Sequence, residues 1–186
     1  PRELIEFAPA LVNTSLMLHD KISSTFQKNA VNFYYEFNLR HITNVFEGLL
    51  RSNSNFLKTV PGLLRLWRHE CNRVYCDRLA TEKDVADYQV LMKQLLKQNH
   101  SDHADECLQE PLLFSHFTHG VHSGENFYDE LPSINNVRDI LQNVLKEYND
   151  TYAAMNLVLF EDAIAHVCRI SRILEGPNGH ALLVGV

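Results

Sequence analysis

The sequence has few cysteines and no long apolar run. Four cysteines are spread through 186 residues, whereas a secreted disulfide scaffold is shorter and denser in cysteine. No stretch approaches the roughly 20 consecutive apolar residues that a membrane-spanning helix needs. The first residues also lack the basic start and apolar core of a signal peptide. We therefore expect a reducing compartment, cysteines that behave as small buried hydrophobes, and no membrane partner.

An excess of basic charge is also missing. The formal net charge is −6, with 22% charged and 45% hydrophobic residues. A mildly acidic chain has no general electrostatic attraction to nucleic acid or anionic lipid, so we expect no nucleic-acid partner. The composition is that of an ordinary globular protein, long enough for one or two domains with a sizeable core.

Two further absences concern the ends. The chain starts without methionine, and it stops within the apolar run 181–186. Both features lead us to expect that the ends are cuts within a longer polypeptide.

What the sequence does contain is helical periodicity. Apolar residues recur at steps of three and four along most of the chain, as they do on one face of an amphipathic helix. A break or kink is expected at Pro9 in the first of these stretches. The sequence therefore predicts a mostly α-helical protein. Its helical stretches cover approximately residues 4–26, 39–50, 60–79, 82–97, 134–148 and 161–174.

Residues that start and stop helices support this reading. Helix N-termini are predicted at Asn38, Thr59 and Ser133, whose side chains can accept a bond from the first helical turn. Thr81 and Asp84 have capping-box spacing. Gly176 and the following proline are typical of a helix end.

The remaining segments are predicted to be non-helical. The aromatic run 33–37 is expected to be extended, and the polar residues after 98 to form a connector with a loop at 120–124. The apolar run 181–186 follows a Gly-Pro-Asn-Gly turn and is predicted to be a strand buried on both faces, as in a parallel sheet.

No residue pattern indicates catalysis or metal binding. The charged residues of segment 65–78 are read as a solvated or inter-module face, with the alternative that one arginine reaches a neighbouring nucleotide. The His-rich connector lacks the spacing of a closed tetrahedral zinc site, so no metal is expected. The chain also lacks a phosphate-loop lysine and a Walker B acid, so we expect it to be inactive alone.

Four runs resemble a known family. They are FNLRHITNVFEG at 37–48, RLWRHECNRVYCDR at 65–78, MNLVLFEDAIAHVCRISRILE at 155–175 and GHALLVGV at 179–186. Their order and spacing resemble the dynein heavy chains between the third and fourth AAA+ modules. Their amino-acid sequences resemble the axonemal outer-arm chains of beta type. The resemblance is weakest at about 98–130.

The resemblance implies an architecture. Residues 1–98 would hold the end of the third module with its small helical lid, 99–132 a connector, and 133–186 the start of the fourth module up to the strand before the P-loop. The expected fold is thus a helical lid bundle followed by the first helices and strand of an α/β module.

The resemblance also implies nucleotide contacts. Arg40 matches a lid arginine that can sense the γ-phosphate, although it could instead be an arginine at a helix start that pairs with a nearby carboxylate. The apolar residues Leu157, Val158, Leu159 and Phe160 would flank the adenine, although they could instead be ordinary core, and Gly185 would lie just before the phosphate loop.

At the level of the whole protein, the resemblance implies a microtubule motor of the ciliary or flagellar axoneme, within the cytoplasm and cytoskeleton. ATP or ADP with Mg would be its cofactors, with none held tightly by this segment alone. Neighbouring AAA+ modules, microtubules and other dynein chains would be its partners. The alternative is a stand-alone helical domain that binds another protein through the face around Trp67. A following Gly-Gly-x-Gly-Lys sequence would favour the motor, and a stop codon after Val186 would exclude it.

Overall fold

The computed structural model describes residues 2–55, 57–118, 128–177 and 179–184. The chain divides into two compact units, Pro1–Glu110 and Pro111–Val186. The fold is mostly α-helical, as the periodicity predicted. Within the described ranges, no helix has the length and apolar character needed to cross a membrane.

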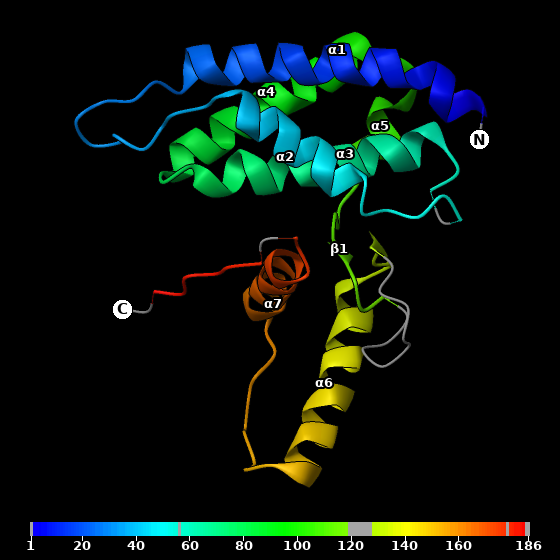
Figure 1. Ribbon diagram of the computed structural model, residues 1–186, viewed down its shortest axis with the longest axis vertical. Coiled ribbons are helices and arrows are strands. Elements are labelled where there is room, and N and C mark those ends of the chain that lie inside the picture. The colour runs from blue at the N-terminus through cyan, green and yellow to red at the C-terminus, as the bar shows by residue number, and fades with distance from the viewer. Residues whose placement is uncertain (1, 56, 119–127, 178, 185–186) are drawn as a thin grey trace. The chain divides into compact units, whose positions relative to one another are not determined.

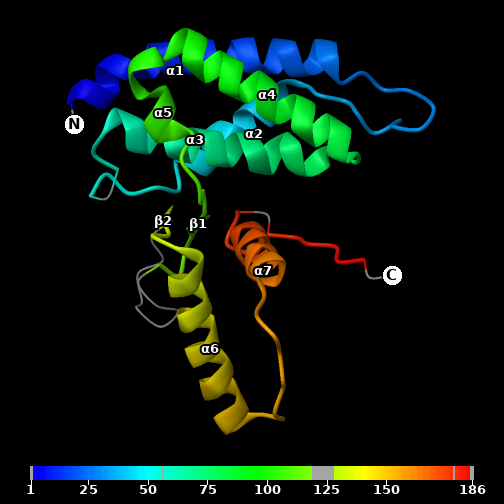
Figure 2. The same ribbon diagram turned by 180° about the vertical axis from the view of Figure 1, so that it is seen from behind.

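The first unit is a helical bundle (Figures 1 and 2). In chain order its elements are α1 (Arg2–Thr25), α2 (Leu39–Leu49), α3 (Val60–Val74), η1 (Cys76–Arg78), α4 (Glu82–Asn99), η2 (Ser101–His103) and α5 (Ala104–Cys107). Helix α3 contacts α1, α2 and α5, and α1 also lies against α4. The unit is therefore organised around α3.

The helix starts follow the predicted caps. Asn38, Thr59 and Ser133 each accept a hydrogen bond from a backbone N–H of the first turn of their helix. Thr81 does the same for α4. The carboxylate of Asp84, expected to complete a capping box there, instead accepts a 2.8 Å hydrogen bond from the Tyr35 hydroxyl. The Asp84 side chain thus makes a tertiary hydrogen bond in place of the local capping bond.

Trp67 is the centre of the first core. Its side chain is fully buried, and its indole N–H donates to Ser15 Oγ at 2.8 Å. Ser15 in turn donates to the carbonyl of Leu11 at 2.8 Å. Burying the polar end of a tryptophan requires such a partner, so α1 and α3 are joined by both apolar packing and a directed hydrogen bond.

Helices α2 and α3 approach closely at Gly48. A Cβ atom placed there would lie 1.8 Å from Glu70 Oε2. Glu70 lies on α3 and is fully buried. Only a residue without a side chain leaves room for this carboxylate, so glycine is required at position 48 by packing rather than by backbone conformation.

Helix α1 differs from its prediction in two ways. It continues through Pro9 without interruption, so the expected break is absent. Its buried face includes Thr14 and Leu18, whereas Val12 and Leu16, two apolar residues of the predicted helical stretch 4–26, are exposed. The polar side chain of Thr14 is accommodated because it donates to Ala10 O and bonds to His100.

The aromatic run 33–37 begins with a turn at residues 33–34, so it is not extended throughout. The Tyr35 N–H donates to Asn32 O at 3.1 Å, and the Tyr35 hydroxyl donates to Asp84 while accepting from the N–H of Ala80. Tyr35 is buried, whereas Phe33 is exposed. These hydrogen bonds hold the run against the start of α4, which the local sequence could not reveal.

The first compact unit extends to Glu110, beyond residue 98 where the lid was expected to end. His100, Ala104 and Cys107 are buried, and α5 contacts α3 and α4. The first part of the polar segment is thus ordered and packs against α3 and α4 as part of the bundle.

The second unit contains β1 (Phe114–Ser115), β2 (Asp129–Glu130), α6 (Ile134–Thr151) and α7 (Glu161–Leu174). The two short strands pair antiparallel. A small core forms where α6, α7 and the segment around β1 meet, and it comprises Phe117, Leu131, Val137, Ile164 and Cys168. The loop expected at 120–124 lies outside the described residues.

The terminal apolar run is not a strand in its described part. Residues 181–184 carry no strand assignment, and Leu182 and Val184 are 91% and 84% exposed. A parallel strand needs hydrogen-bonding neighbours, and among the described residues only β1 and β2 form a sheet. Within this chain, residues 181–184 therefore do not have the expected burial on both faces.

Candidate functional site

The N-terminus of α2 presents Arg40 to solvent. Asn38 Oδ1 accepts from the Arg40 N–H at 3.1 Å, and the Asn38 N–H donates to His41 Nδ1 at 3.0 Å. These reciprocal bonds form a capping box, which fixes the first turn. The Arg40 side chain is exposed. None of the described residues forms a hydrogen bond or ion pair with its guanidinium, so the carboxylate partner of the alternative reading is not found among them.

His41 accounts for the stability of this turn. Its Nδ1 accepts the cap hydrogen bond from the Asn38 N–H in the neutral tautomer that carries its proton on Nε2. Burial is the main cause that lowers the pKa of His41, and the positive charges of Arg78 and Arg40 act in the same direction.

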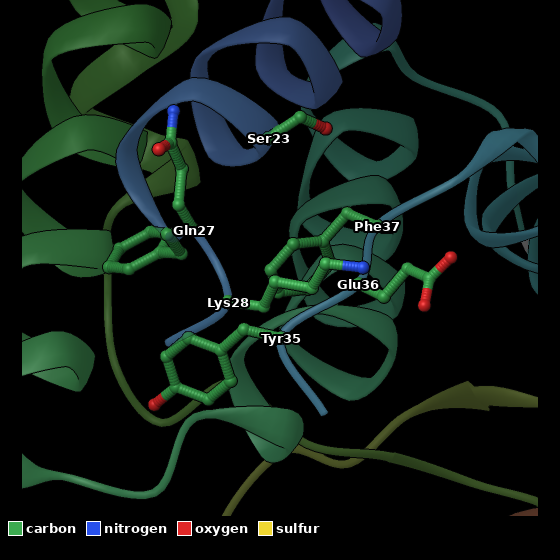
Figure 3. A pocket seen from close by; sticks show the side chains of 7 residues that line it. Ser23, Gln27, Lys28, Tyr35, Glu36 and Phe37 are labelled. Atoms are coloured by element: carbon green, nitrogen blue, oxygen red, sulfur yellow. The ribbon is translucent and has the colours of Figure 1, made fainter. Parts of the chain in front are cut away.

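A hollow lies beside this turn, between the end of α1 and the aromatic run (Figure 3). Its volume is about 340 Å³, and it is lined by Ser23, Phe26, Gln27, Lys28, Tyr35, Glu36 and Phe37. Phe26 and Tyr35 are buried, whereas Lys28 and Glu36 are exposed. The hollow thus combines an apolar floor with a charged rim, and Arg40 is not among its lining residues.

In the second unit, the apolar residues 157–160 connect α6 to α7. Leu157, Val158 and Phe160 are 57%, 80% and 58% exposed. Leu159 is partly buried and packs against the small core. Core packing therefore accounts for one residue of the four, and the other three present apolar surface. Gly185, the remaining candidate, lies outside the described residues.

Two side chains of α6 bond to this connection. Asn149 Oδ1 accepts from the Met155 N–H at 2.8 Å, and its Nδ2 donates to Met155 O at 3.0 Å. Arg138 Nε donates to Leu159 O at 3.1 Å. Sequence reasoning placed Asn149 just after the predicted helical stretch 134–148 and singled out neither Asn149 nor Arg138. The tendency of asparagine to bond nearby backbone groups was the available signal.

Part of the charged face at 65–78 is internal, which corrects the reading of a solvated face for Arg68, His69 and Glu70, whereas Asp77 and Arg78 are exposed. Arg68 is buried, donates to Cys107 O at 2.9 Å and forms an ion pair with Glu110. Arg65 donates to Glu106 O and Gln109 O. The part of the face around Arg68 is covered because α5 packs against α3, and the guanidinium groups of Arg65 and Arg68 are engaged within their own unit.

Metal binding has no support in the described part of the chain, where no group of three or more candidate ligands comes together. His100 instead bonds to Thr14 Oγ1 at 2.9 Å and lies against the ring of Phe7. Burial lowers the pKa of His100, as expected for a neutral core histidine. His119 and His122 lie outside the described residues.

Comparison with protein families gives two matches. The AAA+ lid domain model matches residues 11–110. A second model, described as the P-loop containing dynein motor region D4, matches residues 155–186. The first match coincides with the helical bundle and contains Arg40. The second begins at Met155, where Asn149 bonds the backbone.

Individual relatives cover nearly the whole chain. It is 45% identical over 177 residues to mouse dynein axonemal heavy chain 17, covering 95% of this chain. It is 44% identical to the dynein alpha chain of the flagellar outer arm of Chlamydomonas reinhardtii, covering 95%, and 43% identical to the ciliary dynein beta chain of Tripneustes gratilla, covering 98%. The chain spans about 4% of the length of each of these relatives. Alpha and beta chains match about equally well, so the beta type is not singled out.

Proposed function

Because the chain belongs to the AAA+ lid domain family and is homologous to axonemal dynein heavy chains over nearly its whole length, we propose that it is a segment of an ATP-driven ciliary motor. In this proposal it joins the lid of the third AAA+ module to the start of the fourth. The observation that carries the proposal is the order of the two family matches, lid at 11–110 and region D4 at 155–186. A lid that directly precedes the fourth module is the lid of the third.

The proposed whole protein moves on microtubules in the axoneme of a cilium or flagellum. Its partners are the neighbouring modules of the same heavy chain, microtubules and other dynein chains, and its cofactors are ATP or ADP with Mg. The segment contributes packing surfaces and parts of two nucleotide pockets, with no turnover of its own.

Within the third module, the proposed role of Arg40 is to sense the γ-phosphate. A guanidinium at a helix start that is exposed and has no partner among the described residues can make a charge-assisted hydrogen bond when ATP arrives, and it loses that bond with ADP. Its position also adds to the attraction that a helix N-terminus has for anions. The lid would therefore close more tightly on ATP.

Within the fourth module, the proposed role of residues 157–160 is to flank the nucleotide base. Exposed apolar side chains suit the face of a purine, and nearby backbone groups suit its edge. Leu157, Val158 and Phe160 supply such apolar surface.

The alternative of a stand-alone interaction domain has no support from the residue that was expected to contact its partner. It required Trp67 at a docking face, but Trp67 is fully buried within the first unit. No other observation favours this alternative.

The test is nucleotide discrimination by the motor domain that contains this chain. Arg40→Ala is expected to weaken ATP binding at the third module about tenfold or more relative to ADP, because a hydrogen bond to a charged group is worth about 1.5–3 kcal/mol. Arg40→Lys should retain part of the effect. Arg2→Ala is the control, because Arg2 is an exposed arginine that pairs with the exposed Glu6. All three should melt like wild type, since exposed cations contribute little to stability. An unchanged ratio of ATP to ADP affinity in Arg40→Ala would exclude the sensor role.

A further inference from the structure

The connection between α6 and α7 is held at its start by a side chain that imitates backbone pairing. The amide of Asn149 both donates to and accepts from the same residue, Met155, at 3.0 and 2.8 Å. A side-chain amide carries one acceptor and one donor side by side, and here both are used. Two bonds to one residue fix the direction of its peptide groups as well as its position.

The other end of the connection is held from the same helix. Arg138 Nε donates to Leu159 O at 3.1 Å, while Arg138 Nη1 donates to Asn135 Oδ1 at 2.8 Å. The second bond holds the guanidinium fork within α6, so the bond to Leu159 comes from an oriented donor.

The two attachment points match the length of the connection. The rise of an α-helix places residues 138 and 149 about 16 Å apart along α6. A nearly extended chain from residue 155 to 159 spans about 13 Å. Figures 1 and 2 both show the connection returning from the end of α6 toward the start of α7, antiparallel to α6. One helix can therefore hold both ends at once.

Between the attachment points, the side chains remain exposed. Leu157 and Val158 point apolar surface outward, although Met155 and Leu159 on either side have bonded backbones. An apolar segment that is exposed but fixed at both ends has already lost part of its backbone entropy, so less is lost when a ligand binds.

We propose that Asn149 and Arg138 are positioning residues that hold Met155–Leu159 in the conformation that receives the nucleotide base. This inference rests on the proposed function, because it assigns the base to this connection. Neither residue touches the nucleotide. Each acts through the backbone that it bonds.

The first experiment measures the attachment itself in the motor domain that contains this chain. Amide hydrogen exchange over residues 150–160 is compared in wild type, Asn149→Ala and Asn149→Asp. Asn149→Ala removes both bonds, so exchange at Met155 should accelerate about tenfold or more. Asn149→Asp keeps the acceptor for the Met155 N–H and should accelerate exchange less. Asn143→Ala is the matched control, because Asn143 is an exposed asparagine of the same helix.

The second experiment measures the consequence for the base. Binding at the fourth module is measured for ATP and for inorganic tripolyphosphate, which has the phosphates without the base. Asn149→Ala and Arg138→Ala should each weaken ATP about tenfold and leave tripolyphosphate unchanged. A variant that merely unfolds the module would weaken both ligands.

The outcomes separate this inference from the proposed function. If exchange at Met155 is unchanged in Asn149→Ala, the attachment does not operate and the inference fails, whatever the nucleotide does. If exchange accelerates while ATP affinity is unchanged, the attachment is real, but the assignment of the base to this connection is wrong. If ATP and tripolyphosphate weaken equally, the residues are structural and have no positioning role.

Discussion

Replacing Gly48 with alanine tests the closest approach in the first unit. Alanine normally stabilises a helix interior by about 1 kcal/mol relative to glycine, so propensity alone predicts a more stable protein. The structure predicts the opposite, because the new methyl carbon would lie 1.8 Å from Glu70 Oε2 and 2.3 Å from Glu70 Cδ. A flexible side chain could move aside at the surface, but Glu70 is fully buried.

The net effect follows from these opposing contributions. Inserting a methyl group into a packed core costs about 1–3 kcal/mol, and displacing a buried carboxylate from its bonding partners adds to that cost. After subtraction of the propensity gain, we expect Gly48→Ala to lower the free energy of unfolding by about 1–2 kcal/mol. For a bundle of this size each kcal/mol lowers Tm by about 4–8 °C, so Tm should fall by about 4–16 °C.

Thermal unfolding followed by circular dichroism measures this change, and two variants control for it. Gly62→Ala places its methyl at 3.1 Å from Thr59 Oγ1 and 3.7 Å from Leu57 Cδ1, which requires a shift of only a few tenths of an ångström, so it should lower Tm less than Gly48→Ala does. In a Glu70→Ala background the carboxylate is absent, so Gly48→Ala should no longer destabilise. A rise in Tm for Gly48→Ala alone, or an equal fall in both backgrounds, would refute the packing argument.

Three further predictions concern the first unit and the chain as a whole. Burial lowers the pKa of His19, His41 and His100 below 6.5. Their full contribution to the free energy of unfolding should be present above about pH 6.5 and be lost as the pH falls through the lowered pKa values. The reason is that the unfolded chain binds these protons at a higher pH than the folded chain does. Urea unfolding at pH 7.5 and 5.5 checks this, and equal midpoints would contradict it. Ser15→Ala should cost about 1–3 kcal/mol by leaving the buried Trp67 indole N–H unpaired, and intrinsic fluorescence reports it directly because the chain has one tryptophan. The isolated chain should not hydrolyse ATP, since it lacks the phosphate-loop lysine and the Walker B acid; turnover that follows the chain through purification would overturn this.

Local chemistry was the part of the fold that the sequence predicted well. The caps at Asn38, Thr59 and Ser133 lie at the expected positions, because a cap depends on four or five consecutive residues. The breaker Gly176 likewise follows the end of α7 at Leu174. These features need no knowledge of what packs nearby.

Features that depend on distant partners were predicted less well. The charges of α3 looked solvated because periodicity cannot show that α5 will cover Arg68. The run 181–184 looked buried because apolar composition says nothing about whether strands lie beside it. For the candidate site, Arg40 could be identified from its motif and placed at a helix start. Asn149 was missed as a site residue because its partner Met155 lies beyond the turn.

The arginine bonds at the end of the first unit have a mechanical consequence. Arg65 and Arg68 hold the carbonyls of Glu106, Cys107 and Gln109 from the side of α3, immediately before the chain leaves the bundle at Glu110. A pull on the backbone at that point would have to break these charge-assisted bonds before α5 could separate from α3. Part of the force would therefore be carried by the central helix.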